Sequence, residues 1–196
     1  MLNPVILMGT HIRLEPLAMA HADDLARTTG DPATWLYHGI GDLTERADLE
    51  AYIASVQDEP SHGTGLNFAV VMNTADRAIG ATSLWDISLA HRRAEIGRTW
   101  LPPNARRTGA NTEAKFLLLR HAFESLGMLR VQLKTDTRNT ASRHAIERLG
   151  ATYEGVLRSH MILHNGLVRD TAYYSVIADE WSAVKEHLQE LMTPRL

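Results

Sequence analysis

The chain has 196 residues, of which 44% are hydrophobic and 22% charged, with a formal net charge of −3. This composition indicates one globular domain over residues 1–196 and argues against extensive disorder, membrane insertion or a basic nucleic-acid-binding face. The absence of cysteine excludes disulfides, thiolate metal ligands and a cysteine nucleophile. Residues 1–13 lack the pattern of a secretory signal, so we expect a cytoplasmic location.

The N-terminal half of the chain predicts one strand, two helices and then an antiparallel meander. Alternating apolar and polar residues indicate the strands, and apolar residues at helical spacing indicate the helices. In chain order, the predicted elements are strand His11–Leu17, helices His21–Thr29 and Thr44–Gln57, and strands Asn67–Met72, Ala78–Leu89 and Arg93–Leu101.

Aromatic residues of this half are candidates for lining a substrate pocket. Trp35, Tyr37 and His38 lie in the loop between the two helices, and loops of this kind often line ligand sites. Trp85 lies in the second strand of the meander. Aromatic side chains are more often core; we favour the core for Trp85 and leave the other three open.

The C-terminal half predicts a strand between two helices, then a hairpin and a last helix. Good caps and stops mark the helices, namely Asn139 at one start and Gly127 and Gly150 at two ends. An Asn165-Gly166 turn of two residues would place Ile162 opposite Arg169. The predicted elements are helix Thr112–Leu126, with Phe116, Leu119, Phe123 and Leu126 as its buried stripe, strand Arg130–Asp136, a helix from Asn139 to Gly150, strands Tyr153–His164 and Leu167–Ile177, and helix Asp179–Leu191.

The junction between strand Arg93–Leu101 and the helix that follows it has the residues of an anion site. Arg106, Arg107 and Gly109 lie there, followed by small residues. The first turn of a helix presents unpaired N–H groups and the positive end of the helix dipole, which together bind phosphate groups. The alternative is that these residues only start a helix whose arginines face solvent.

Three segments resemble the GNAT family of N-acetyltransferases, most closely its RimJ/RimL-like branch of ribosomal-protein N-terminal-alanine acetyltransferases. They are Ala94–Leu101 with Arg106–Asn111, the start of a helix at Asn139–Ser142, and Tyr153–Arg158 with Arg169–Thr171 across the hairpin. The family's loop ends in Gly or Ala where this chain has Asn111, a residue type that tolerates left-handed conformations. The resemblance spans Thr10 to Trp181.

The resemblance implies an α+β fold with a central, mostly antiparallel, twisted sheet of about seven strands flanked by helices. A splayed pair of strands would hold acetyl-CoA, with its pantetheine arm along the strand that ends in Thr99, Trp100 and Leu101. The loop and first helical turn would hold the pyrophosphate. The implied cofactor-binding residues are Thr99, Trp100, Leu101, Arg106, Arg107, Thr108, Gly109, Ala110, Asn111, Thr112, Asn139 and Ser142.

The implied reaction moves an acetyl group from acetyl-CoA to a primary amine. Ser142 is the candidate proton donor to the leaving thiolate, or else it only favours a helix start. Glu95 is the candidate base, acting through a water, or else a surface partner of Arg93 or Arg98. Because cysteine is absent, direct attack in a ternary complex is favoured over an acyl-enzyme.

The acceptor and the assembly stay open at this stage. A protein N-terminus and a small amine both satisfy the chemistry, and a monomer and a homodimer are both compatible with the sequence. The alternative function is a catalytically inactive acyl-CoA-binding protein. We expect no bound metal, because His160 and His164 fall in a predicted strand, where four residues span roughly 13 Å.

Overall fold

The central element of the fold is a single sheet of eight strands in the order β1-β2-β3-β4-β5-β6-β8-β7. A computed structural model describes residues 2–106 and 108–193. The strands are β1 Leu7–Met8, β2 Ile12–Pro16, β3 Gly65–Met72, β4 Arg77–Ser88, β5 Arg93–Trp100, β6 Arg130–Asp136, β7 Thr152–Ile162 and β8 Val168–Ile177. Among these strands only β5 and β6 pair in parallel. The predicted mixed fold with a mostly antiparallel sheet is confirmed, and the short β1 is an addition to it.

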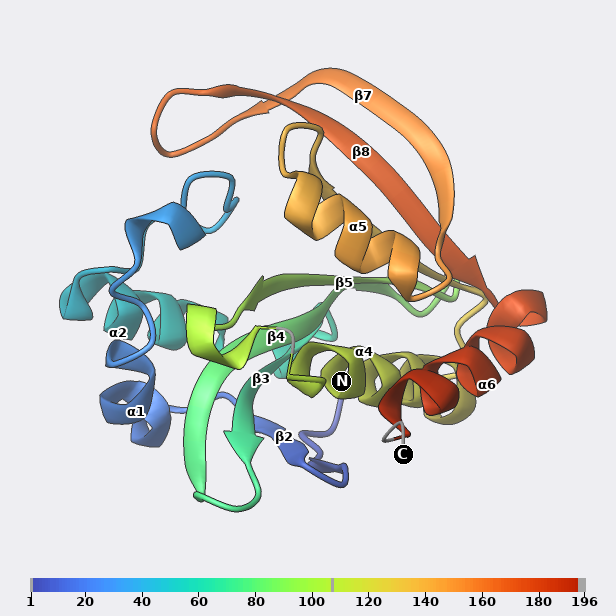
Figure 1. Cartoon of the computed structure of the whole chain (residues 1–196), viewed down its shortest axis with the longest axis horizontal. Helices are drawn as coiled ribbons and strands as arrows, with labels where there is room; N and C mark the ends of the chain where they lie inside the picture. Colours follow the sequence, from blue (N-terminus) through green and yellow to red (C-terminus); the bar gives the residue numbers. More distant parts are fainter. Residues whose placement is uncertain (1, 107, 194–196) are drawn as a thin grey trace.

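Helices pack against the sheet and form the connections between some of its strands (Figure 1). The helices are α1 Ala22–Ala26, α2 Arg46–Val56, α3 Glu59–His62, α4 Ala110–Arg120, α5 Thr140–Arg148 and α6 Trp181–Met192. Helix α4 packs against α6 and β2, and α1 packs against α2 and β4. The β7–β8 hairpin arches over α5, toward the loop that follows α1.

The most consequential feature of the sheet is that β5 and β6 separate halfway along. Their pairing runs from Arg93 opposite Arg130 to Ile96 opposite Leu133. Beyond that point β6 stays paired with β8, and β5 stays paired with β4 as far as Trp100. A bulge in β5, where Arg98 has a φ of 50°, bends the strand at this place. One edge of Gly97–Trp100 is therefore left without a neighbouring strand.

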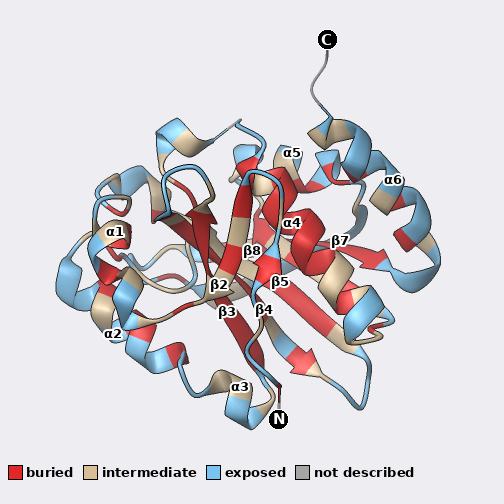
Figure 2. Cartoon of the chain, turned by 90° about the horizontal axis from the view of Figure 1, so that it is seen from below, coloured by how far each residue is buried: buried red, intermediate tan, exposed pale blue. Residues whose placement is uncertain are grey.

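Helix α4 is buried on almost all sides (Figure 2). Every residue from Thr112 to Leu119 is buried, including the charged Glu113 and Lys115. The predicted stripe is too narrow, because α4 lies between the sheet and α6 instead of on the surface. The helix also changes to a π-helical turn at His121–Ser125, where Phe123 is only partly buried.

The hairpin turn differs from the predicted one. Ile162 pairs with Val168 and Met161 pairs with Arg169, so the connection spans residues 163–167. Only Gly166 has a positive φ, of 78°. Leu163 accepts from the N–H of Gly166 and donates its own N–H to Leu167, which is the pattern of a type I turn followed by a bulge. The prediction that Ile162 faces Arg169 is wrong for this reason.

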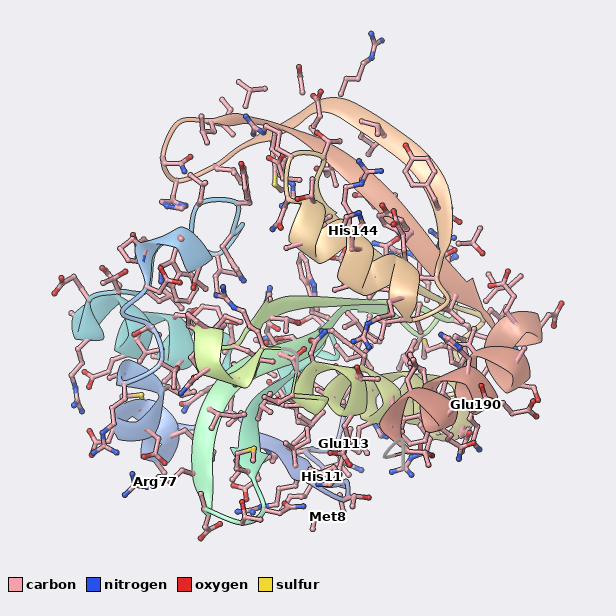
Figure 3. All side chains as sticks on the ribbon, viewed as in Figure 1. Met8, His11, Arg77, Glu113, His144 and Glu190 are labelled. Carbon is pink, nitrogen blue, oxygen red and sulfur yellow. The ribbon has the colours of Figure 1, made fainter. Side chains whose placement is uncertain are left out.

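The carboxylate of Glu113 ties the N-terminal segment to α4. It accepts from the backbone N–H groups of Thr10, His11 and Ile12, with His11 and Ile12 at 3.1 Å from Oε2. Figure 3 shows Glu113 beside His11, although the two residues are far apart in the sequence.

Replacing Glu113 by glutamine should therefore destabilise the fold. The amide turns an NH₂ group toward N–H donors and removes charge-assisted hydrogen bonds, at a cost of about 2–3 kcal/mol. Urea unfolding measures this loss. Glu190→Gln, on the exposed face of α6, is the matched control and should change stability by less than about 0.5 kcal/mol. Equal stabilities of the two variants would contradict the anchoring role.

Candidate acyl-donor and acceptor site

The free edge of β5 lies close to two loops. The Thr99 carbonyl accepts from Nε2 of His38 at 3.2 Å, and the Leu101 carbonyl accepts from Nε of Arg106 at 3.1 Å. Trp100 points its side chain into the core, where it is 2% exposed. A ligand lying along this strand would therefore meet backbone groups, with Thr99 near its middle.

The start of α4 has the geometry of an anion site. Gly109 caps the helix in a left-handed conformation, with a φ of 90°, and nothing lies near the position of a β-carbon there. Asn111 lies inside the helix and is not in a left-handed conformation. The left-handed residue at this helix start is thus Gly109, and Asn111 has ordinary helical geometry within α4. Thr108 bonds back to the Ala105 carbonyl at 2.7 Å.

Arg106 of this loop makes hydrogen bonds to two other segments. Arg106 donates to the Thr34 hydroxyl at 2.9 Å and to the Leu101 carbonyl, so it joins the loop after α1 to the end of β5. Arg107 lies outside the described residues. On the inner side of the helix start, the Thr112 hydroxyl accepts from Arg148 of α5 at 2.8 Å. The two helices that flank the separated strands are therefore fastened together.

Ser142 lies half-buried in the first turn of α5, and Asn139 is the cap of that helix. The Asn139 side chain accepts from the backbone N–H of Ser142 at 3.0 Å. No hydrogen bond of the Ser142 hydroxyl is found in the described part of the chain. Because the side chain of Asn139 caps the helix, the Ser142 hydroxyl is available to a ligand.

Glu95 lies at the apex of the separated strands, one residue before their last pair. It is 1% exposed, and its Oε2 contacts Nζ of Lys134 at 2.9 Å and Nε2 of Gln132 at 2.9 Å. The alternative of a surface ion pair is wrong, because Arg93 pairs with Asp86 and Arg98 pairs with Glu59. The other carboxylate oxygen of Glu95, Oε1, contacts neither Lys134 nor Gln132.

Trp85 of β4 lies beside Glu95, at the point where β5 and β6 separate. It is half-buried and belongs to neither apolar core, so the preference for a core position is wrong. The guanidinium of Arg98 lies 4.3 Å from the ring centroid and the ammonium of Lys134 lies 4.9 Å from it. Gly97 makes room for this ring, since a β-carbon there would come within 2.7 Å of Trp85 Nε1.

The three aromatic residues of the loop after α1 play different parts. Trp35 is fully buried against Trp100, and its Nε1 donates to the Thr29 carbonyl at 2.9 Å, so it supports the loop from below. The Tyr37 ring lies 5.5 Å from the guanidinium of Arg138, which follows β6. Burial lowers the pKa of His38 to about 4. Tyr37 and His38 thus face the ends of the separated strands.

Two buried cations were not recognised as site residues from the sequence, although Arg169 lies in one of the segments that resemble the family. Lys115 of α4 is 6% exposed and donates to the hydroxyls of Thr82 and Thr99, and burial lowers its pKa to about 7. Arg169 of β8 is 5% exposed. No local pattern could have found Lys115, because the helix around it is buried on every side. Arg169 carried only the weak signal of alternation in its strand.

The model of the GNAT acetyltransferase domain matches residues 11–152. The chain belongs to the GNAT acetyltransferase family. A GNAT relative, the uncharacterized N-acetyltransferase p20 of Bacillus licheniformis, is 26% identical over 90% of this chain and 98% of its own. A GCN5-related N-acetyltransferase from Brucella melitensis has a TM-score of 0.90 at 31% identity, covering 98% of this chain and 87% of that one.

RimJ, whose branch the sequence resembles, is also among the structural neighbours. Mycobacterium smegmatis RimJ, solved with CoA-disulfide, has a TM-score of 0.82 at 20% identity and covers 96% of this chain and 93% of that one, which shows the shared GNAT fold. Within residues 2–106 and 108–193, no three potential metal ligands converge. None of the helices in that part is both long and apolar enough to cross a bilayer.

Proposed function

We propose that the protein transfers an acetyl group from acetyl-CoA to a primary amine by direct attack in a ternary complex. The observation that carries this proposal is the free edge of Gly97–Trp100, with the helix start at Gly109 and the Ser142 hydroxyl on the elements beside it. GNAT proteins use acetyl-CoA as donor, and these residues supply what each part of the donor needs.

The donor would be bound mainly by backbone groups. The pantetheine amides would pair with the free edge of β5 in the manner of an added strand. The pyrophosphate would lie at the first turn of α4, where N–H groups and the helix dipole favour negative charge. Arg106, whose Nε and Nη2 donate to Leu101 and Thr34, would add positive charge from the same loop.

The chemistry requires two proton movements. The amine nitrogen attacks the thioester carbonyl carbon, its C–S bond breaks, and the nitrogen loses a proton while the thiolate gains one. Glu95 would accept the amine's proton through a water at its uncommitted Oε1, and Ser142 would donate to the sulfur. A backbone N–H near Thr99 would polarise the carbonyl oxygen.

Replacing Ser142 by alanine should lower kcat tenfold to a thousandfold, on the order expected for the loss of a proton donor. Stability should be unchanged, because the cap is provided by Asn139. Steady-state kinetics together with thermal unfolding measure both effects. The control is Ser182→Ala on the exposed start of α6. Unchanged kcat in Ser142→Ala would leave this serine without a role in proton transfer.

The activity itself is tested by release of CoA thiol from acetyl-CoA with a panel of small amines and peptide N-termini. Release that depends on an amine supports the enzyme. Tight binding of acetyl-CoA without release to any amine would support an inactive acyl-CoA-binding protein instead.

A further inference from the structure

Arg169 is a buried cation that has no hydrogen-bond or ion-pair partner among residues 2–106 and 108–193. Its Nε and Nη2 atoms are buried and make no hydrogen bond, and no carboxylate of the described residues forms an ion pair with it. A guanidinium carries five N–H donors, and burying them without an acceptor is costly. Such a group is retained most easily where a ligand supplies the missing acceptor.

The carboxylates around Arg169 are already engaged. Asp136 is held by Arg138 through two side-chain contacts of 2.9 and 2.7 Å, and Glu95 is held by Lys134 at 2.9 Å. Asp136 and Glu95 still act on Arg169 electrostatically, although burial lowers its pKa overall. Asp170 also acts on Arg138, so the six groups comprise three cations and three anions, and among them Arg169 is the cation that no carboxylate of the described residues pairs with. An anionic ligand group would balance its charge.

His38 provides an unused acceptor on the opposite wall. Its Nε2 faces the Thr99 carbonyl, which can only accept, so Nε2 carries the proton and Nδ1 has the lone pair. Nδ1 is buried and makes no hydrogen bond with any residue that the structure describes. The neighbouring Gly39 lies against Arg169, since a β-carbon there would be 3.9 Å from Nη1. Since Gly39 follows His38 in the chain and Arg169 also acts electrostatically on His38, the two side chains lie in the same region of the fold.

This place adjoins the predicted donor site. His38 is bonded to Thr99 on the free edge of β5. Nδ2 of Asn165, at the tip of the β7–β8 hairpin, donates to the Leu36 carbonyl at 3.0 Å, which holds the hairpin against the loop. Arg169 and His38 thus lie on two elements that close over the end of the separated strands.

We propose that Arg169 and His38 form an acceptor subsite for a small amine that carries a carboxylate on the neighbouring carbon, as a free α-amino acid does. The carboxylate accepts from Nε and Nη2 of Arg169, which can bind both of its oxygens side by side. The neutral amine donates one N–H to Nδ1 of His38, and its lone pair is left for the thioester. This inference rests on the proposed function and names the class of its acceptor.

The charges disfavour the other acceptors. A polyamine would bring positive charge beside the Arg169 guanidinium, which has no anionic partner among the described residues. A peptide N-terminus with a neutral first residue offers Arg169 a carbonyl but no balancing charge. A peptide whose N-terminal residue is Asp or Glu has a side-chain carboxylate, which lies farther from the amine than the α-carboxylate of a free amino acid. Such peptides are tested separately.

The test compares acceptors in matched pairs with the wild type and the variants Arg169→Met and Arg169→Lys. The panel contains free α-amino acids, the corresponding α-amides, peptides with neutral or acidic N-terminal residues, and spermidine. Thiol release gives KM and kcat, and saturation-transfer NMR measures binding of the same amines without acetyl-CoA. Thermal unfolding of each variant supplies a readout independent of ligands.

For the wild type we expect at least one amino acid to be preferred over its amide in KM by about 10- to 100-fold, the range for a lost charge-assisted hydrogen bond. Arg169→Met should abolish this preference, and Arg169→Lys should restore part of it. Arg169→Met should unfold at the same or a higher Tm, because it removes an unpaired buried charge.

Three results would overturn the inference. They are equal KM values for acids and amides, a preference that survives in Arg169→Met, and a large loss of Tm in that variant, which would make Arg169 structural. Transfer to amines without any acid preference would leave the proposed function standing. If the wild type neither binds nor uses acetyl-CoA, the proposed function fails, and the NMR arm then decides on the subsite alone.

Discussion

Replacing Lys115 by methionine is expected to stabilise the protein by about 2–4 kcal/mol near pH 6. The Lys115 ammonium is buried between α4 and the sheet, its hydrogen-bond partners among the described residues are the hydroxyls of Thr82 and Thr99, and burial lowers its pKa from 10.5 to about 7. A shift of that size corresponds to roughly 5 kcal/mol between protonation states, from which the lost contacts of the two hydroxyls subtract. Methionine fills a similar volume without a charge.

The effect of Lys115 depends on pH in a defined direction. Between about pH 7 and pH 10.5 the unfolded chain holds the proton of this lysine and the folded protein does not. Stability therefore rises with pH in that window, and the gain is lost as pH falls to about 7. From pH 6 to pH 9 the wild type should gain about 3 kcal/mol relative to Lys115→Met.

Urea unfolding of both proteins at pH 6 and pH 9 measures this difference. Lys185→Met is the matched control, because Lys185 is partly exposed on α6 beside Glu124. A constant difference between wild type and Lys115→Met across this pH range would show that Lys115 keeps its ordinary pKa and makes contacts other than those described.

The second large effect is expected for Glu95→Gln, which should lower kcat by about 10²- to 10⁴-fold, the range for loss of a general base. Glutamine keeps the shape of the side chain but cannot take a proton from the attacking amine. It also leaves Lys134 without its carboxylate, so the fold loses stability as well.

A double variant separates the two consequences. Glu95→Gln with Lys134→Met removes both charges of the pair and should recover most of the stability lost in Glu95→Gln. Its kcat should stay low if Glu95 is the base. Recovery of kcat along with stability would show that Glu95 only supports the apex of the sheet. Thermal unfolding and steady-state kinetics of the wild type, Glu95→Gln, Lys134→Met and the double variant give the answer.

The order and type of the main elements could be read from the sequence because each has a strong local signal. Alternation marks β6 and β8, and the cap at Asn139 marks α5. What the sequence could not show depends on neighbours far along the chain. The two residues of β1 become a strand only because β2 lies beside them, and the turn at Gly166 takes its type from the register of β7 and β8.

The parts of the candidate site that a sequence motif defines could be predicted. The parts that depend on contacts between distant segments could not. Gly109 and Asn139 lie as their motifs predict, at two helix starts. The partner of Glu95 was mispredicted because neighbours in sequence were considered, whereas Lys134 comes from the adjacent parallel strand. Arg169 and His38 come together only through the packing of a hairpin on a loop, which no spacing in the sequence encodes.

The central claim is that the separated strands bind acetyl-CoA, and calorimetric titration of the purified protein with acetyl-CoA tests it most directly. We predict saturable binding of one acetyl-CoA per chain, weakened at least tenfold in Gly109→Val, because a branched residue is strained at the left-handed φ of 90° that shapes the helix start. Absence of binding by the folded wild type would contradict the account.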